Sequence, residues 1–200
     1  MNTAQSETEL SVIRKIMEDS RNVVVNNGWY YIYWGIVVTC ALIANYIMAL
    51  IGVGMNYQGM MWFILMNSAW IIGAIVERRK AKKRKVRTFA GKLLASLWFA
   101  AGISMFMFGF IGTMSHAYNA VFICPIISTL LGSTYIISGA IQQVRWMQLL
   151  SIGWWGGAIY NFLFPSIHTL IIFAGMMIFL QTIPGIILYR KWKKNPVTAE

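Results

Sequence analysis

Long apolar segments separated by short polar ones recur along the whole chain. An apolar run of about 20 residues is the length that an α-helix needs to cross the hydrocarbon core of a membrane. Helices are predicted rather than strands, because a helix satisfies its backbone hydrogen bonds within one segment. The pattern predicts six spans, over residues 29–50, 60–76, 93–114, 117–141, 147–164 and 169–189.

The connections between most of these segments are short, which favours antiparallel neighbours. The predicted fold class is therefore all-α, a polytopic transmembrane helical bundle whose six spans form three antiparallel hairpins. Similar runs rich in Ile and Gly close the second, fourth and sixth spans, at residues 71–75, 136–141 and 183–187. Repetition of one ancestral hairpin would explain this similarity, but chance explains it equally well, because both residue types are common in membrane helices.

Ahead of the first span, residues 6–25 are polar but periodic. Leu10, Ile13, Met17 and Val24 recur at intervals of three, four and seven residues, which predicts an N-terminal amphipathic helix. Its apolar stripe would lie either along the membrane interface or against the underside of the bundle, and both alternatives remain open.

The positive charges predict the orientation of the spans. All 17 Lys and Arg residues fall on one side of the predicted spans, whereas the opposite loops around residues 55–59, 115–119 and 165–168 carry no charged residue. The positive-inside rule then places both termini in the cytoplasm. The predicted divisions are a cytoplasmic amphipathic segment (1–28), a six-helix transmembrane domain (29–189) and a basic cytoplasmic tail (190–200).

The net charge of +11 raises the question of a nucleic-acid partner. The basic residues sit beside apolar spans rather than on a polar domain face, so anionic lipid headgroups are the predicted partner and nucleic acid is not. The candidate headgroup-binding residues form one run after the second span: Arg78, Arg79, Lys80, Lys82, Lys83, Arg84 and Lys85.

Two motifs resemble those of a family of small uncharacterised bacterial six-span integral membrane proteins. The first span opens with Gly28-Trp29-Tyr30-Tyr31, and the last span ends with the sequence 182–188, Thr-Ile-Pro-Gly-Ile-Ile-Leu, before a basic tail. The resemblance implies a membrane fold and a location in the bacterial cytoplasmic (inner) membrane, and it implies no activity.

The acidic residues argue against an enzyme and against proton-coupled transport. All six lie outside the predicted spans: Glu7, Glu9, Glu18, Asp19, Glu77 and Glu200. The spans thus lack paired carboxylates for acid–base catalysis, an acid for a Ser-His-Asp triad, and the ionisable groups that mark proton relays. We therefore predict no enzymatic activity and no cofactor.

His116 and His168 are the weak candidates for metal ligands, because both fall in loops on the uncharged side. Two imidazoles without cysteine or carboxylate neighbours make an incomplete zinc site. Hydrogen bonding to water or headgroups is the simpler interpretation, so no metal is predicted.

Uncharged polar residues within the spans are candidates for a polar core: Asn45, Asn67, Ser133, Asn161 and Gln181. They would either bond helix to helix or line a polar path. Pro125 and Pro184 are expected to kink or interrupt their helices.

Small residues four apart, Gly153 with Gly157 and Ala69 with Gly73, suit close helix packing inside the bundle or in a homo-oligomer. These features favour a non-enzymatic membrane scaffold or regulatory partner. The alternative is a carrier or channel for a neutral or hydrophobic small molecule that is not proton-coupled.

Overall fold

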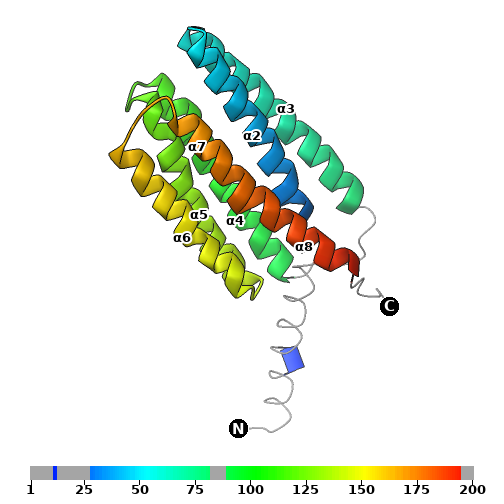
Figure 1. The fold of residues 1–200 in the computed structure, drawn as a ribbon. Coiled ribbons are helices and arrows are strands. Elements are labelled where there is room, and N and C mark those ends of the chain that lie inside the picture. Colours follow the sequence, from blue (N-terminus) through cyan, green and yellow to red (C-terminus); the bar gives the residue numbers. More distant parts are fainter. Residues whose placement is uncertain (1–10, 13–27, 82–88, 195–200) are drawn as a thin grey trace.

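The computed structural model describes residues 11–12, 28–81 and 89–194, and all regular elements in these residues are helical (Figure 1). The all-α prediction is confirmed for this part of the chain. Of the predicted amphipathic helix, only Ser11 and Val12 are described, and both are helical. The rest of that prediction, together with Lys82–Lys85 and residues 195–200, lies outside the described residues.

The helices follow the apolar segments closely. In chain order they are α2 (Gly28–Leu50), α3 (Met55–Ala81), α4 (Phe89–Phe106) with the π-helix η2 (Met107–Gly112), the 3-10 helix η3 (Ala120–Phe122) leading into α5 (Ile123–Ile141), α6 (Arg145–Leu163), and finally α7 (Thr169–Met176), η4 (Met177–Thr182) and α8 (Ile183–Lys194). The last three, of which η4 is a π-helix, form one rod. The second apolar segment is longer as a helix than predicted, because α3 extends into flanking polar residues at both ends.

Five of the helices are long and apolar enough to cross a membrane: Gly28–Leu50, Met55–Arg79, Phe89–Gly112, Ala120–Ile141 and Thr169–Lys191. This suggests a transmembrane protein. The fifth predicted span corresponds to α6, which is 19 residues long but is not among these five. Polar residues such as Gln148, Ser151 and Asn161 interrupt the apolar residues of α6 along its length.

The rod α7–η4–α8 lies between α2 and α6 in Figure 1, with α4 and α5 behind it and α3 at one edge beside α2. The most extensive packing joins α5 to α6 and α2 to the rod, rather than the predicted pairs. Small residues explain these pairings. Gly28 of α2 lies against the backbone of Gly185 and Tyr189 in the rod, and Gly139 of α5 lies against Val144 and Gln148 at the start of α6. Close backbone approach of this kind is what small residues allow between apolar helices.

The two prolines lie in different settings along their helices. Pro125 is the third residue of α5, in the first helical turn, where its missing N–H breaks no helical hydrogen bond. Pro184 is the second residue of α8, and the rod continues through it to Lys194. The wider π turn accommodates the proline ring, and Thr182 Oγ1 donates to the Met177 carbonyl oxygen 3.1 Å away.

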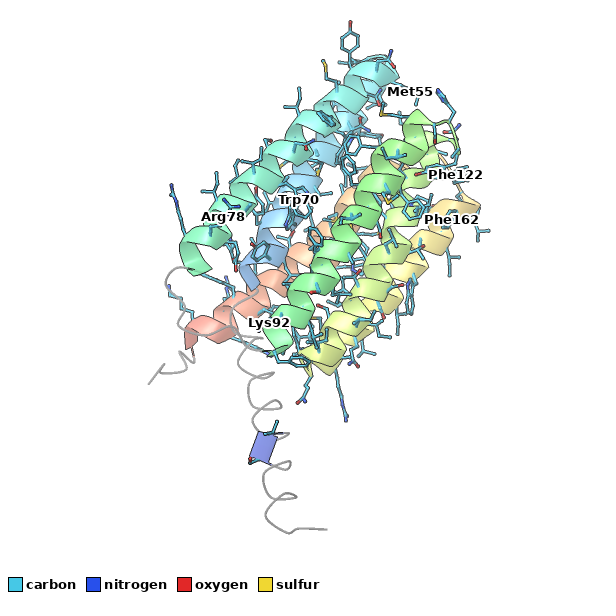
Figure 2. All side chains as sticks on the ribbon, turned by 180° about the vertical axis from the view of Figure 1, so that it is seen from behind. Met55, Trp70, Arg78, Lys92, Phe122 and Phe162 are labelled. Carbon is cyan, nitrogen blue, oxygen red and sulfur yellow. The ribbon has the colours of Figure 1, made fainter. Side chains whose placement is uncertain are left out.

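The two ends of the bundle differ in charge. Arg78 near the end of α3 and Lys92 near the start of α4 lie at one end of the molecule, and Met55 lies at the other (Figure 2). The start of α6, with Arg145, and the end of α8, with Arg190 and Lys191, also lie at the first end. We call this the basic end and the opposite one the uncharged end.

Candidate functional site

Three buried side chains and the half-buried Trp98 form a hydrogen-bonded group in the half of the bundle nearer the basic end. The Tyr31 hydroxyl of α2 lies 3.0 Å from Ser138 Oγ of α5. Trp98 Nε1 of α4 donates to the same Ser138 Oγ at 3.3 Å. Gln142 Nε2 lies 3.3 Å from the Tyr31 hydroxyl and 3.2 Å from Ser138 Oγ. We call these residues, Tyr31, Trp98, Ser138 and Gln142, the serine cluster.

Helical spacing places these residues together. Ser138 and Gln142 are four apart and therefore share one face of α5 at its carboxyl end. Tyr31 belongs to the buried stripe of α2, which also includes Gly28, Gly35 and Leu42. Gln142 Nε2 also bonds to the Ser138 carbonyl oxygen at 3.2 Å, which fixes the amide orientation at the helix end.

Aromatic rings frame the serine cluster and continue from it toward the uncharged end. The Tyr31 ring centroid lies 5.4 Å from that of Trp98 and 5.7 Å from that of Tyr135, both in edge-on geometry. Tyr135 then contacts Trp154 at 5.8 Å, and Trp154 contacts Phe173 at 5.9 Å. This chain of rings connects α2, α4, α5, α6 and α7, and edge-on aromatic pairs add specific attraction to area burial.

A second polar group lies nearer the uncharged end. Asn45 Oδ1, Ser128 Oγ and both polar side-chain atoms of Asn161 are buried without a hydrogen-bond partner among the described residues. Asn45 precedes Tyr46, whose hydroxyl is 3.0 Å from His168 Nδ1 in the turn before α7. Asn161 is two residues from the end of α6. The two asparagines therefore lie near the same end, and each buried unpaired polar atom is costly.

The other predicted polar-core residues are divided between the interior and the surface. Gln181 is buried in η4, where its Oε1 lies 3.5 Å from the Tyr135 hydroxyl. Asn67 and Ser133 are exposed, so the structure does not place them in the core. Each bonds to its own helix, Asn67 Nδ2 to the Phe63 carbonyl at 2.7 Å and Ser133 Oγ to the Thr129 carbonyl at 3.2 Å.

Tyr31, Trp98 and Gln142 were not among the candidate site residues predicted from the sequence. The available signal was the four-residue spacing of Ser138 and Gln142, which puts two polar side chains on one face of an apolar helix. Tyr31 and Trp98 gave no comparable signal, because aromatic residues are common throughout the predicted spans.

The two histidines lie in different turns. His168 pairs with Tyr46 as described, whereas His116 is exposed and has a left-handed backbone with φ of 55°. Within the described part of the chain, no group of three His, Cys, Asp or Glu residues could hold a metal ion. Nearby, the Tyr118 hydroxyl donates to the Phe108 carbonyl oxygen, and partial burial raises the pKa of this phenol.

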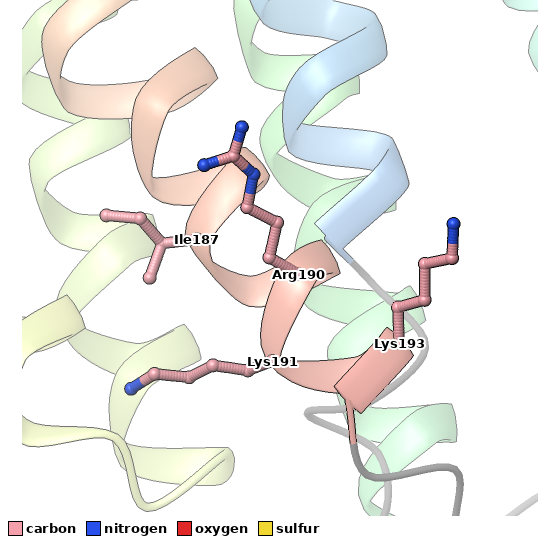
Figure 3. A pocket seen from close by; sticks show the side chains of 4 residues that line it. All are labelled: Ile187, Arg190, Lys191 and Lys193. Carbon is pink, nitrogen blue, oxygen red and sulfur yellow. The ribbon is translucent and has the colours of Figure 1, made fainter.

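Basic residues gather at the ends of α3 and α8. Arg78 and Arg79 are exposed, Lys80 lies in α3, and the remaining predicted headgroup residues lie outside the described residues. At α8, a groove of about 500 Å³ is lined by Ile187, Arg190, Lys191 and Lys193. Figure 3 shows its three cationic side chains leaving the helix in different directions, so they do not converge on one point. Lys191 Nζ lies 5.9 Å from the ring centroid of Trp146.

The polar groups of the serine cluster are phenol, hydroxyl, indole and carboxamide, all of which are uncharged. Such groups hold helices together by interhelical hydrogen bonds in an apolar environment. The chain matches no protein-family model, and comparisons with curated proteins and with solved structures gave no match.

Proposed function

We propose that this protein is a non-enzymatic membrane scaffold or regulatory partner that works through contacts between helices within the bilayer. In this proposal the six predicted spans cross the bacterial inner membrane as three hairpins, and both termini are cytoplasmic. The six spans correspond to α2, α3, α4 with η2, η3 with α5, α6 and the rod. The uneven distribution of Lys and Arg supports the orientation. The basic residues at the ends of α3 and α8 would then contact anionic headgroups, each contributing about 1 kcal/mol of attraction.

The filled interior is the observation that carries this proposal. Tyr135, Met147 and Trp154 are 0% exposed. Tyr135 and Met147 contact the serine cluster and Trp154 contacts Tyr135, so large side chains fill this part of the interior. A cavity of about 90 Å³ lined by Trp29, Tyr30, Tyr33, Ile72, Gly73 and Val76 lies between α2 and α3, at the edge of the bundle. Packing of this kind suits a rigid body that presents its outer helices to other proteins.

The carrier alternative is favoured by one observation, the unpaired atoms of Asn45, Ser128 and Asn161. Buried polar atoms without partners are exceptional in native proteins, and a hydrogen-bonding solute could satisfy them during transport. This alternative requires the rings of Tyr135 and Trp154 to move apart.

Flux measurements separate the two functions. Vesicles containing the purified protein would be challenged with urea and glycerol, and solute entry would be followed by light scattering. The scaffold proposal expects the same rate as in vesicles without protein. A faster rate that Asn161→Leu abolishes, while Ser133→Ala leaves it unchanged, would instead establish the carrier.

A positive test of the scaffold uses photo-crosslinking in the native host cells. A photoreactive phenylalanine at exposed Phe63 or Phe99 should give discrete protein adducts, and the same group at buried Phe173 should give none. Adducts with lipid alone at both exposed positions would contradict the scaffold proposal.

A further inference from the structure

Helix α3 is the least enclosed of the five long apolar helices. Only 6% of its most apolar window is buried inside the chain, compared with 39% for the helix Ala120–Ile141. One line of exposed residues runs along it with alternating spacings of four and three: Met60, Ile64, Asn67, Ile71 and Ala74. We call this line the α3 stripe. Such spacing is typical of the seam between two helices that pack at a small left-handed angle.

Asn67 lies in the middle of the segment Met55–Arg79 and in the middle of the α3 stripe. Its carboxamide has two N–H groups and one carbonyl oxygen, and the hydrogen bond to Phe63 uses one N–H. In the membrane orientation proposed above, the remaining donor and acceptor face the hydrocarbon core. Polar groups at that depth are costly unless they find a partner on another helix.

The small residues that the sequence analysis considered for a homo-oligomer interface pack against other helices of the same chain. Gly153 lies against Leu180 and Gly157 against Met176. Gly73 faces the Tyr33 ring, and the Tyr33 hydroxyl donates to the Ala69 carbonyl oxygen at 2.8 Å. These positions therefore already contact other helices of the same chain.

We propose that the α3 stripe pairs with the α3 stripe of a second copy of this chain, with the two Asn67 carboxamides hydrogen-bonded to each other. This inference rests on the proposed membrane location. A second copy inserts with the same orientation, so its Asn67 lies at the same depth without further adjustment. Rotation about an axis along the membrane normal then brings both amides together.

Two properties of the stripe favour a second copy over a different protein. A carboxamide is both donor and acceptor and is therefore complementary to itself. From Met60 to Ala74 the stripe also has no charged residue, so two copies can approach without repulsion across this length. A different partner would need its own polar group at the depth of Asn67.

The test measures dimer dissociation for the full-length protein in bilayers, by energy transfer between labelled copies at increasing lipid dilution. Asn67→Leu should raise the dissociation constant about 3- to 30-fold, the equivalent of one interhelical hydrogen bond. Asn67→Gln should restore most of the affinity. Ser133→Ala is the matched control, because Ser133 is also an exposed polar residue bonded to its own helix, and it should change nothing.

Disulfide crosslinking locates the interface independently. In a background with Cys40→Ser, where the remaining Cys124 is buried, an added cysteine replacing Ile64 or Ile71 should give crosslinked dimers, and one replacing half-buried Leu65 should not. Equal dissociation constants for Asn67→Leu and the wild type, or a monomer at every dilution, would overturn the inference. Failure of the protein to float with vesicles in a density gradient would instead contradict the membrane location itself.

Discussion

The Tyr31 hydroxyl and Ser138 Oγ lie 3.0 Å apart although 107 residues separate them in the sequence. This contact joins α2 to α5, two helices that belong to different predicted hairpins. Because Trp98 bonds to Ser138 Oγ and Gln142 bonds to both atoms, one small polar group connects three helices. The serine cluster is therefore the place where changes of single atoms should have measurable effects.

Tyr31→Phe removes the hydroxyl and leaves the ring in place. We expect a loss of about 0.5–2 kcal/mol in the free energy of unfolding, because an interhelical hydrogen bond is lost and Gln142 keeps fewer partners. Thermal unfolding of the purified protein in detergent measures this loss. Tyr57→Phe is the control, because Tyr57 is 64% exposed. Equal unfolding temperatures for the two variants would show that the cluster contributes nothing to stability.

Gly185→Ala should disturb the contact between α2 and the rod. A Cβ on Gly185 would lie 2.9 Å from the backbone nitrogen of Ile32, and backbone cannot move aside cheaply. We expect a destabilisation of about 1–3 kcal/mol, typical of an overpacked interior. Gly175→Ala in the same rod is the control, since its Cβ would have no neighbour within 4 Å. An equal loss in the free energy of unfolding for Gly175→Ala and Gly185→Ala would contradict this prediction.

The proposed orientation is tested by labelling single cysteines in intact cells. Cysteines replacing Asn56, Ser115 or Ser166 should react with a thiol reagent that does not cross the membrane, because these residues lie in the uncharged loops of the predicted topology. Cysteines replacing Ala81 or Thr198 should react only after the cells are opened. Labelling at Ala81 in intact cells would reverse the orientation.

The absence of charged residues from the predicted spans has a consequence for energy coupling. Without Asp, Glu, Lys or Arg at that depth, no side chain there is suited to take up and release a proton during a transport cycle. Vesicles carrying the protein and a pH gradient should therefore neither accumulate a neutral solute nor lose the gradient when it is added. Accumulation that an uncoupler abolishes would contradict this prediction.

The sequence was a good guide to where helices occur and a poor guide to which faces are buried. Runs of apolar residues were sufficient for α2, α4, α5 and the rod, because length and composition decide them. In α3, however, the residues that pack inside and those that remain exposed are both apolar, so periodicity does not distinguish the faces. The choice of neighbours depends on individual glycines, such as Gly28 and Gly139, meeting backbone from distant segments.

The polar residues illustrate the same limit. Asn67 and Asn161 look equivalent in the sequence, since each is a single asparagine in an apolar segment, yet one is exposed and the other is 0% exposed. The cluster around Ser138 escaped prediction because Gln142 lies one residue beyond α5, where a polar residue looks like the start of a loop. Gln142 joins the serine cluster because α2 and α4 pack against the end of α5, which the sequence alone does not indicate.

The π-helix η4 determines the direction, around the rod axis, in which the side chains of α8 point. Phe173, Met177, Gln181 and Gly185 are all buried at constant intervals of four residues. A regular α-helix turns about 100° per residue, so such a row would wind steadily around its axis, and the wider π turn slows that winding. Deleting one residue between Met177 and Thr182 would therefore rotate Arg190 and Lys191 by about a quarter turn relative to the buried row. The direction in which the basic end presents its charges is thus determined by a widened turn two helical turns earlier in the rod.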